Sequence, residues 1–195
     1  NVDGTRHVLN LVKQTRTRRL QHVSTAYIAG NRNDVALETE IHVGQTFKNA
    51  YEESKCQAEL MIAEEQRKGS IVASIYRPSI VIGDSKSCRA THFHGVYAFI
   101  RALSGALARL RRRARENGPV NLPLRVLGVE TQTLNFVPID YVVDGMVTIS
   151  ERADSKGGTY HLANPAPTEN HVWLKNICRL LRVEGIQLVG HHSFL

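Results

Sequence analysis

Hydrophobic positions follow helical and strand-like spacings in turn along the chain, and this pattern predicts an α/β fold. Apolar residues recur at helical spacing between Val8 and Val12, and good helix formers run from Asn49 to Arg67. A short apolar run at 20–24 predicts a strand, and the run at 71–76 is apolar enough to be buried on both faces of a parallel sheet. The order helix, strand, helix, strand is half of a doubly wound α/β unit.

The rest of the chain predicts a smaller mixed α/β part. Residues 31–48 have no clear period and form a loop long enough to be functional. Prolines at 119 and 123 interrupt the later pattern, and we expect Gly185 to end the last helix. The predicted strands in this part are 79–84, 124–127, 134–137, 159–162 and 186–189, and the predicted helices are 93–115, 138–150 and a segment around Trp173.

Composition adds limits on the class of protein. The chain has 195 residues, of which 42% are hydrophobic, so it can bury a core. Its three cysteines are far apart and include no C-x-x-C pair, which argues against a disulfide framework or a zinc site and favours a reducing cytoplasm. We expect no metal site, and we interpret His92 and His94 as surface histidines. There is no secretory signal pattern and no apolar run of about eighteen residues, so we expect no membrane segment.

Positive charge is concentrated in two places. The formal net charge is +7 at pH 7, and the denser cluster comprises Arg109, Arg111, Arg112, Arg113 and Arg115. This cluster is either a solvated helix face, a contact for a phosphate-bearing substrate or acidic carrier protein, or a nucleic-acid contact. Nucleic acid is the least favoured partner because no aromatic residues are interleaved with the arginines.

Tyr51 and Lys55 form the most informative pair for chemistry. They are four residues apart in a predicted helix, so they share one face with Cβ atoms about 5–6 Å apart. A cation beside a phenol favours the phenolate, which makes the tyrosine a better acid or base near neutral pH. The Tyr-x-x-x-Lys spacing is common by itself, so its interpretation depends on the neighbouring segments.

Four further segments occur in a fixed order around this pair. They are Asn1-Val2-Asp3-Gly4-Thr5, Val23-Ser24-Thr25-Ala26-Tyr27, Arg77-Pro78-Ser79-Ile80-Val81-Ile82-Gly83-Asp84 and Asn135-Phe136-Val137-Pro138-Ile139-Asp140-Tyr141-Val142-Val143-Asp144. With Tyr51-Glu52-Glu53-Ser54-Lys55, they resemble the extended short-chain dehydrogenase/reductases over nearly the full length. The residues in these segments are most similar to those of the thioester reductases and fatty acyl-coenzyme A reductases, and less similar to those of sugar epimerases and dehydratases.

The resemblance implies a catalytic set. Tyr51 would donate a proton to a carbonyl oxygen, or accept one in the reverse direction, and Lys55 would support it. Thr25 would donate a hydrogen bond to the same oxygen, and Asn1 matches a family asparagine of less certain role. Two simpler interpretations stay open, since Thr25 is otherwise a strand-end hydroxyl bonded to backbone and Asn1 a helix cap.

The resemblance also implies a nicotinamide cofactor, with NADP(H) favoured over NAD. Tyr51 and Lys55 would contact its ribose, and Pro78, Ser79 and Ile80 match the segment beside its nicotinamide ring. We therefore expect a Rossmann-like doubly wound parallel sheet. Residues 1–85 would form the carboxyl-terminal half of the NAD(P)-binding domain, and 86–195 mostly a substrate-binding region, with 134–150 packing back on the first part.

One feature departs from the family pattern. No glycine-rich G-x-x-G-x-x-G turn, which would bind the dinucleotide pyrophosphate, occurs in the 195 residues. We expect this sequence to be a fragment that lacks the amino-terminal half of its domain and is inactive alone. That missing half would be its main partner, and the uncovered sheet edge would favour self-association.

These observations predict an NAD(P)-dependent reductase of a carbonyl or of an acyl thioester bound to coenzyme A or a carrier. The enzyme alternative is a nucleotide-sugar epimerase or dehydratase. The non-enzyme alternative is a dinucleotide-sensing or structural relative, which the presence of both Tyr51 and Lys55 disfavours.

Overall fold

A computed structural model describes residues 1–91, 95–114 and 118–190 in two compact units. The first unit comprises Asn1–Lys86 and Phe136–Pro165, and the second comprises Ser87–Asn135 and Ala166–Leu195. The histidines predicted to lie on the surface at 92 and 94, and Arg115 of the arginine cluster, lie outside the described residues.

A parallel sheet of order β1-β2-β7 lies at the centre of the first unit. It comprises β1 (Arg19–Val23), β2 (Val72–Pro78) and β7 (Thr159–Leu162). Leu20 of β1 pairs with Ala73, and Tyr76 of β2 pairs with Tyr160. The prediction of an apolar parallel strand at 71–76 is confirmed, although the strand runs two residues further, through Pro78.

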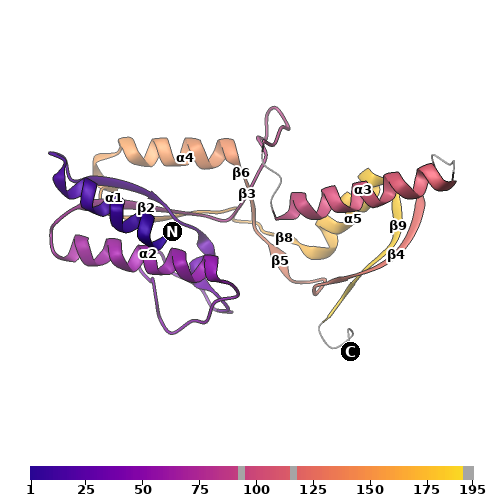
Figure 1. The fold of residues 1–195 in the computed structure, drawn as a ribbon, viewed down its shortest axis with the longest axis horizontal. Coiled ribbons are helices and arrows are strands. Elements are labelled where there is room, and N and C mark those ends of the chain that lie inside the picture. The colour runs from indigo at the N-terminus through magenta and orange to yellow at the C-terminus, as the bar shows by residue number, and fades with distance from the viewer. Residues whose placement is uncertain (92–94, 115–117, 191–195) are drawn as a thin grey trace. The chain divides into compact units, whose positions relative to one another are not determined.

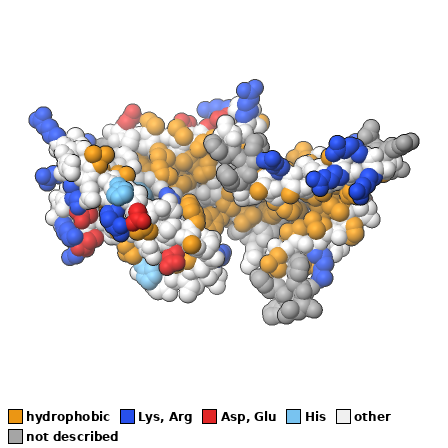
Figure 2. All heavy atoms as spheres, in the orientation of Figure 1, with side chains coloured by type: hydrophobic (Ala, Val, Ile, Leu, Met, Phe, Trp, Pro, Cys, Tyr) orange, Lys and Arg blue, Asp and Glu red, His pale blue; other side chains and the backbone are white. Residues whose placement is uncertain are grey.

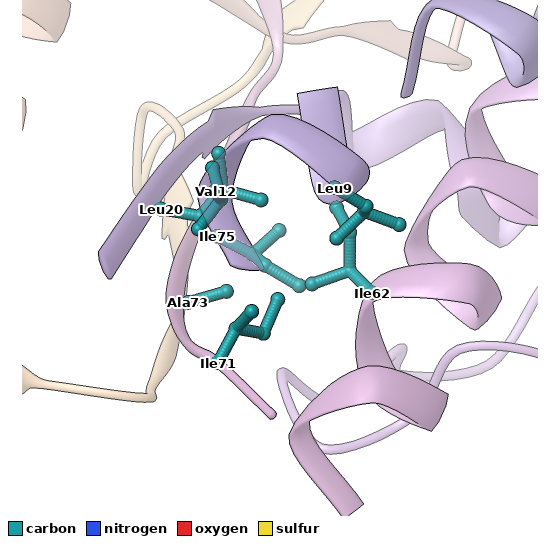
Figure 3. Close-up of a cluster of buried hydrophobic side chains, with 7 residues drawn as sticks. All are labelled: Leu9, Val12, Leu20, Ile62, Ile71, Ala73 and Ile75. Atoms are coloured by element: carbon teal, nitrogen blue, oxygen red, sulfur yellow. The ribbon is translucent and has the colours of Figure 1, made fainter. Parts of the chain in front are cut away.

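Two helices cover one face of this sheet, as Figure 1 shows: α1 (Val2–Gln14) and α2 (Ala50–Arg67). Their apolar faces meet alternate residues of β1 and β2 in a core of fully or nearly fully buried side chains. This core comprises Leu9, Val12, Leu20, Ile62, Ile71, Ala73 and Ile75 (Figure 3). Burying one such aliphatic side chain contributes roughly 1.5–3 kcal/mol, so this cluster is a main source of stability for the unit.

The helix α4 (Ile139–Glu151) covers the opposite face of the sheet (Figure 1). Its Val142 packs with Tyr76, Val137 and Leu162 in a second buried cluster. Because both faces of β2 are covered, side chains on both of its faces are buried, which explains why the strand is largely apolar rather than alternating.

The predicted strand at 134–137 is wrong as a single element. It divides into β5 (Thr133–Leu134), which pairs antiparallel with β8 (Thr168–Glu169), and β6 (Phe136–Pro138), which pairs in parallel with β3 (Ile80–Ile82). The division falls at Asn135, where the chain passes from the second unit to the first. Apolar pattern alone does not distinguish one strand from two that change partners.

The second unit pairs two helices with a two-stranded parallel sheet. Its elements are α3 (Val96–Ala114), α5 (Asn170–Leu181), β4 (Val120–Leu127) and β9 (Val183–Val189). Leu103 and Leu107 of α3 pack against Val183 in its core. Two short 3₁₀ helices, η1 (Ala26–Ala29) and η2 (Ala153–Ser155), belong to the first unit.

Two predictions in this unit are corrected. Pro123 lies inside β4 because the register with β9 shifts between Asn121 and Leu124, so Pro123 makes no ladder pair. The helix α5 ends at Arg182 in a left-handed conformation (φ 51°, ψ 54°), and Gly185 lies within β9. Gly185 has φ +84° opposite the irregular part of β4, where a Cβ atom would lie 3.1 Å from the Leu122 carbonyl oxygen.

None of the helices within the described ranges combines the length and apolar character needed to cross a lipid bilayer.

Candidate active site

The start of α2 is fixed by reciprocal capping. Asn49 is the N-cap, and its side-chain oxygen accepts a 2.9 Å hydrogen bond from the Glu52 amide. The buried Glu52 carboxylate in turn accepts a 3.0 Å bond from the Lys48 amide, which fastens the preceding loop to the helix. Tyr51 therefore occupies the first turn of a rigid helix, with 52% of its surface exposed and open to a ligand.

Lys55 lies one turn further along α2 and contacts the sheet. Its ammonium donates a 2.9 Å hydrogen bond to the carbonyl oxygen of Val23, the last residue of β1. Burial lowers the pKa of Lys55, and the nearby Glu59 carboxylate opposes that change. The lysine is thus held at the carboxyl end of β1, the edge at which α/β sheets bind ligands.

Thr25 lies two residues after the end of β1 and is 5% exposed. Its hydroxyl oxygen accepts a 3.2 Å bond from the Tyr27 amide, which caps η1, and it lies 3.5 Å from the Pro78 carbonyl oxygen. The backbone interpretation of this hydroxyl therefore holds in the structure. Among the described residues its contact as a donor, to Pro78, is long, so its proton remains available to an oxygen placed nearby.

Asn1 is joined to α2 by a side-chain bond. Its amide nitrogen donates a 2.8 Å hydrogen bond to the Ser54 hydroxyl, which donates to the Tyr51 carbonyl oxygen at 2.9 Å. Asn1 is the N-cap residue of α1 by position, but its side chain makes no capping bond. These bonds tie Asn1 to the first turns of α2, and the separate bond from Lys55 ties the same helix to the end of β1.

The predicted cofactor segment lies where β2 ends and β3 begins. Pro78 and Ser79 are buried and Ile80 is half-buried. The Ser79 hydroxyl, in a residue 8% exposed, has no hydrogen-bond partner within the described residues, and neither does the hydroxyl of Ser24, in a residue 3% exposed. Buried hydroxyls without partners are costly. Two of them at the ends of neighbouring strands fit a polar ligand such as a nicotinamide ribose or carboxamide.

Sequence reasoning missed three residues near this site: Ser24, Glu59 and Arg77. Glu59 is 0% exposed and forms an ion pair with Arg77, which is 1% exposed. A signal for Glu59 was present, since it lies four residues after Lys55 just as Lys55 follows Tyr51. Ser24 and Arg77 lie in segments that carry the family resemblance, but the sequence assigned no role to either residue.

The arginine cluster lies at the carboxyl-terminal end of α3. Figure 2 shows Lys and Arg side chains gathered over this helix. Arg111 donates bonds of 2.7 Å and 3.1 Å to the carbonyl oxygens of Leu181 and Arg182, so it ties α3 to the end of α5. The other described members, Arg109, Arg112 and Arg113, are exposed.

Comparisons with known proteins agree on one fold and family. The chain is 26% identical over 171 residues to the non-canonical nonribosomal peptide synthetase cpsA of Aspergillus campestris, a match that covers 83% of this chain and 15% of that protein. It superimposes with a TM-score of 0.76 and 26% identity on the terminal R domain of the myxalamid PKS-NRPS biosynthetic pathway, covering all of this chain and 45% of that one. It thus spans less than half the length of either relative.

A third solved structure supports the fold alone. It is a double mutant of the dTDP-glucose 4,6-dehydratase DesIV from Streptomyces venezuelae with NAD and DAU bound. The match covers 97% of this chain and 53% of the dehydratase chain, with a TM-score of 0.68 and 18% identity. The parallel sheet and its flanking helices therefore have the predicted Rossmann-like fold.

A family model described as male sterility protein, an NAD-binding domain, matches residues 1–146. Because this match covers most of the chain, including Tyr51 and Lys55, the protein belongs to the male sterility family of NAD-binding domains, and the predicted resemblance is confirmed.

Proposed function

We propose that this chain supplies the proton-transfer side of an NAD(P)-dependent reductase that acts on a carbonyl or an acyl thioester. The observation that carries the proposal is the bond from Lys55 to the Val23 carbonyl oxygen, which holds the Tyr51 helix at the carboxyl end of β1, beside Thr25. The family match and the 26% identity to a terminal R domain support the same reaction class.

Each residue has a defined role in this proposal. The nicotinamide dinucleotide, when bound, supplies a hydride to the substrate carbon. Tyr51 transfers a proton to the carbonyl oxygen, and Thr25 donates a hydrogen bond that strengthens as negative charge develops there. Lys55 supports Tyr51 by fastening the Tyr51 helix to the end of β1, and Asn1 orients the first turns of α2 through Ser54.

The cofactor contacts are assigned to the residues that fit them. Tyr51 and Lys55 would hold the ribose hydroxyls, and Pro78 and Ile80 would lie beside the nicotinamide ring. The Ser79 hydroxyl, which has no hydrogen-bond partner among the described residues, would donate or accept a hydrogen bond to the cofactor. We assign NADP(H) rather than NAD on the predicted resemblance to thioester reductases.

We assign an acyl thioester on a carrier or coenzyme A as the substrate. The relatives that support this are a nonribosomal peptide synthetase and the R domain of a PKS-NRPS pathway. The exposed arginines at 109, 112 and 113 suit a phosphate-bearing thioester, since guanidinium groups bind phosphate well. The likeness to a sugar dehydratase extends only to the fold, and product analysis separates the two reactions.

The test is Tyr51→Phe in a polypeptide that contains this chain and binds NADPH. Loss of a general acid typically costs about 10²–10⁴-fold in rate, so we expect kcat to fall by that factor with NADPH affinity within a few-fold of the parent. Tyr141→Phe is the matched control, because Tyr141 is also helical, in the same unit and 52% exposed. Equal activity of the two variants would refute the proposed role.

A further inference from the structure

Arg77 and Glu59 form a charged pair inside the core of the first unit. The Arg77 Nη2 atom lies 2.6 Å from Glu59 Oε2, and Nε lies 3.1 Å from Oε1. The two residues are 1% and 0% exposed. Removing two charges from water is so unfavourable that such a pair adds little or nothing to stability compared with apolar side chains of the same volume. Its presence therefore calls for a role other than stability.

The remaining N–H donors of Arg77 bind the loop that precedes α2. Its guanidinium donates to the carbonyl oxygens of Glu40 at 2.8 Å, Glu38 at 3.3 Å and Leu37 at 3.4 Å. Only arginine among the side chains offers five N–H donors in one rigid plane, so it alone can hold a carboxylate and three carbonyls together. The loop 31–48 is thereby fastened to β2.

The same loop has other polar attachments. The Glu40 carboxylate accepts bonds from Arg32 and from the Leu37 amide, at 2.8 Å and 3.0 Å, within the loop itself. The Glu38 carboxylate accepts a 2.6 Å bond from the His161 amide in β7. A segment with no regular helix or strand is thus held by Arg77, by β7 and by its own side chains.

Glu59 connects this anchor to the proton-transfer residues. Tyr51, Lys55 and Glu59 follow one another at four-residue intervals on α2, so they lie along one face of the helix. That face passes from exposed Tyr51, through half-buried Lys55, to fully buried Glu59. Arg77 therefore holds α2 through the Glu59 carboxylate, and it holds the loop through the loop's carbonyl oxygens. The loop is also bonded to α2 directly, from the Lys48 amide to the Glu52 carboxylate.

We propose that Arg77 and Glu59 are positioning residues for the reaction: together they fix the loop 31–48 and the Tyr51–Lys55 face of α2 to the end of β2. This inference rests on the proposed role of Tyr51 and Lys55. Neither Arg77 nor Glu59 contacts the reacting atoms, and both act through the backbone they hold.

The test separates positioning from stability by replacing both charges at once. Arg77→Met alone leaves Glu59 buried without a partner and destabilises the protein. The double variant Arg77→Met/Glu59→Leu removes both charges with similar volume, so its denaturation midpoint should return to near the parent value. Three quantities are measured in a polypeptide that contains this chain and binds NADPH: the midpoint, amide hydrogen exchange across residues 31–48, and kcat/KM.

If Arg77 and Glu59 are positioning residues, the denaturation midpoint of the double variant recovers, but the order of the loop 31–48 and the catalytic activity do not. Exchange at the Leu37 and Lys48 amides should be at least about tenfold faster than in the parent, and kcat/KM about 100-fold lower, the usual cost of a misplacement of about 1 Å. Recovery of exchange and activity together with the midpoint would overturn the proposal. The exchange measurement is independent of activity, so it still tests the anchor if the Tyr51 variant refutes the proposed function.

Two further variants complete the design. Arg67→Met/Glu64→Leu is the matched control. Arg67 and Glu64 form an ion pair on α2 with the same 2.6 Å separation as Arg77 and Glu59, but this pair is exposed. All three readouts should therefore stay near the parent values. Arg77→Lys keeps a cation beside Glu59 without the fork that reaches the carbonyls. If the double variant fails to regain stability, Arg77→Lys gives the same two outcomes: faster loop exchange supports the anchor, and parent-like exchange overturns it.

Discussion

Lys55 lies between an exposed tyrosine and a fully buried glutamate on one face of α2. Burial lowers the pKa of this lysine, and the Glu59 carboxylate opposes that change. Folding thereby gives three equally spaced residues three different environments: Tyr51 is exposed, Lys55 is half-buried and Glu59 is fully buried. The spacing was visible in the sequence, but the gradient of burial was not.

Thr25 allows a prediction at the same scale. Its hydroxyl caps η1 by accepting from the Tyr27 amide, and in the proposed reaction it donates to the substrate oxygen. Thr25→Val removes both functions, and we expect kcat to fall by about 10²–10³-fold, the usual effect of losing one oxyanion donor. Steady-state kinetics with a thioester substrate measures this.

Thr25→Ser is the control for that experiment because it retains the hydroxyl. We expect it to keep most of the parent activity. If the valine variant were as active as the serine variant, Thr25 would be only a structural cap.

Individual helices and strands show where the hydrophobic pattern was sufficient to predict an element and where it was not. The helices α2 and α4 and the strands β2 and β7 lie close to their predicted positions, because the hydrophobic pattern of each is regular along its length. The prediction of a single strand in segment 133–138 was wrong because β5 and β6 pair with strands of different units. That pairing depends on contacts between residues remote in sequence.

The helix α3 carries arginines of two kinds. Arg111 is committed to the last carbonyls of α5, where a cation is favourable, while Arg109, Arg112 and Arg113 face solvent. A substrate contact through this cluster therefore has to use the exposed members. The sequence alone did not separate them from Arg111.

We expect Arg109→Ala/Arg112→Ala/Arg113→Ala to raise the KM for a coenzyme A or carrier-bound thioester about tenfold and to leave the NADPH dissociation constant unchanged. The reason is loss of attraction for phosphate, so the effect should diminish at high salt. Titrating initial rates against thioester concentration at two ionic strengths tests it. Arg67→Ala, an exposed arginine of the first unit, serves as the control, and an unchanged KM in the triple variant would remove the cluster from substrate binding.

At the scale of the whole molecule, the described part of the chain leaves apolar surface uncovered. In the sheet β1-β2-β7, β1 pairs with β2 alone among the described strands. Val23 and Val72 at this sheet, and Val8 and Leu11 on α1, are each at least 43% exposed. An open parallel edge beside exposed apolar side chains is a template for association.

We therefore expect the 195-residue polypeptide on its own to self-associate. Sedimentation velocity at increasing concentration should show species larger than a monomer, and Leu11→Glu, on the exposed side of α1, should shift the distribution back toward monomer. A single monomeric species for the parent chain at all concentrations would contradict this prediction.

The sequence by itself determined the α/β class, the parallel character of β2, the family and the identity of Tyr51, Lys55 and Thr25 as candidates. These follow from local periodicity and from residues close together in the chain, which hydrophobic pattern and motifs record directly. The tertiary structure alone decided the pairing of Arg77 with Glu59 and, among the described residues, the lack of hydrogen-bond partners for the hydroxyls of Ser24 and Ser79. Burial and long-range contacts depend on which segments fold against each other, and the one-dimensional pattern does not record that information.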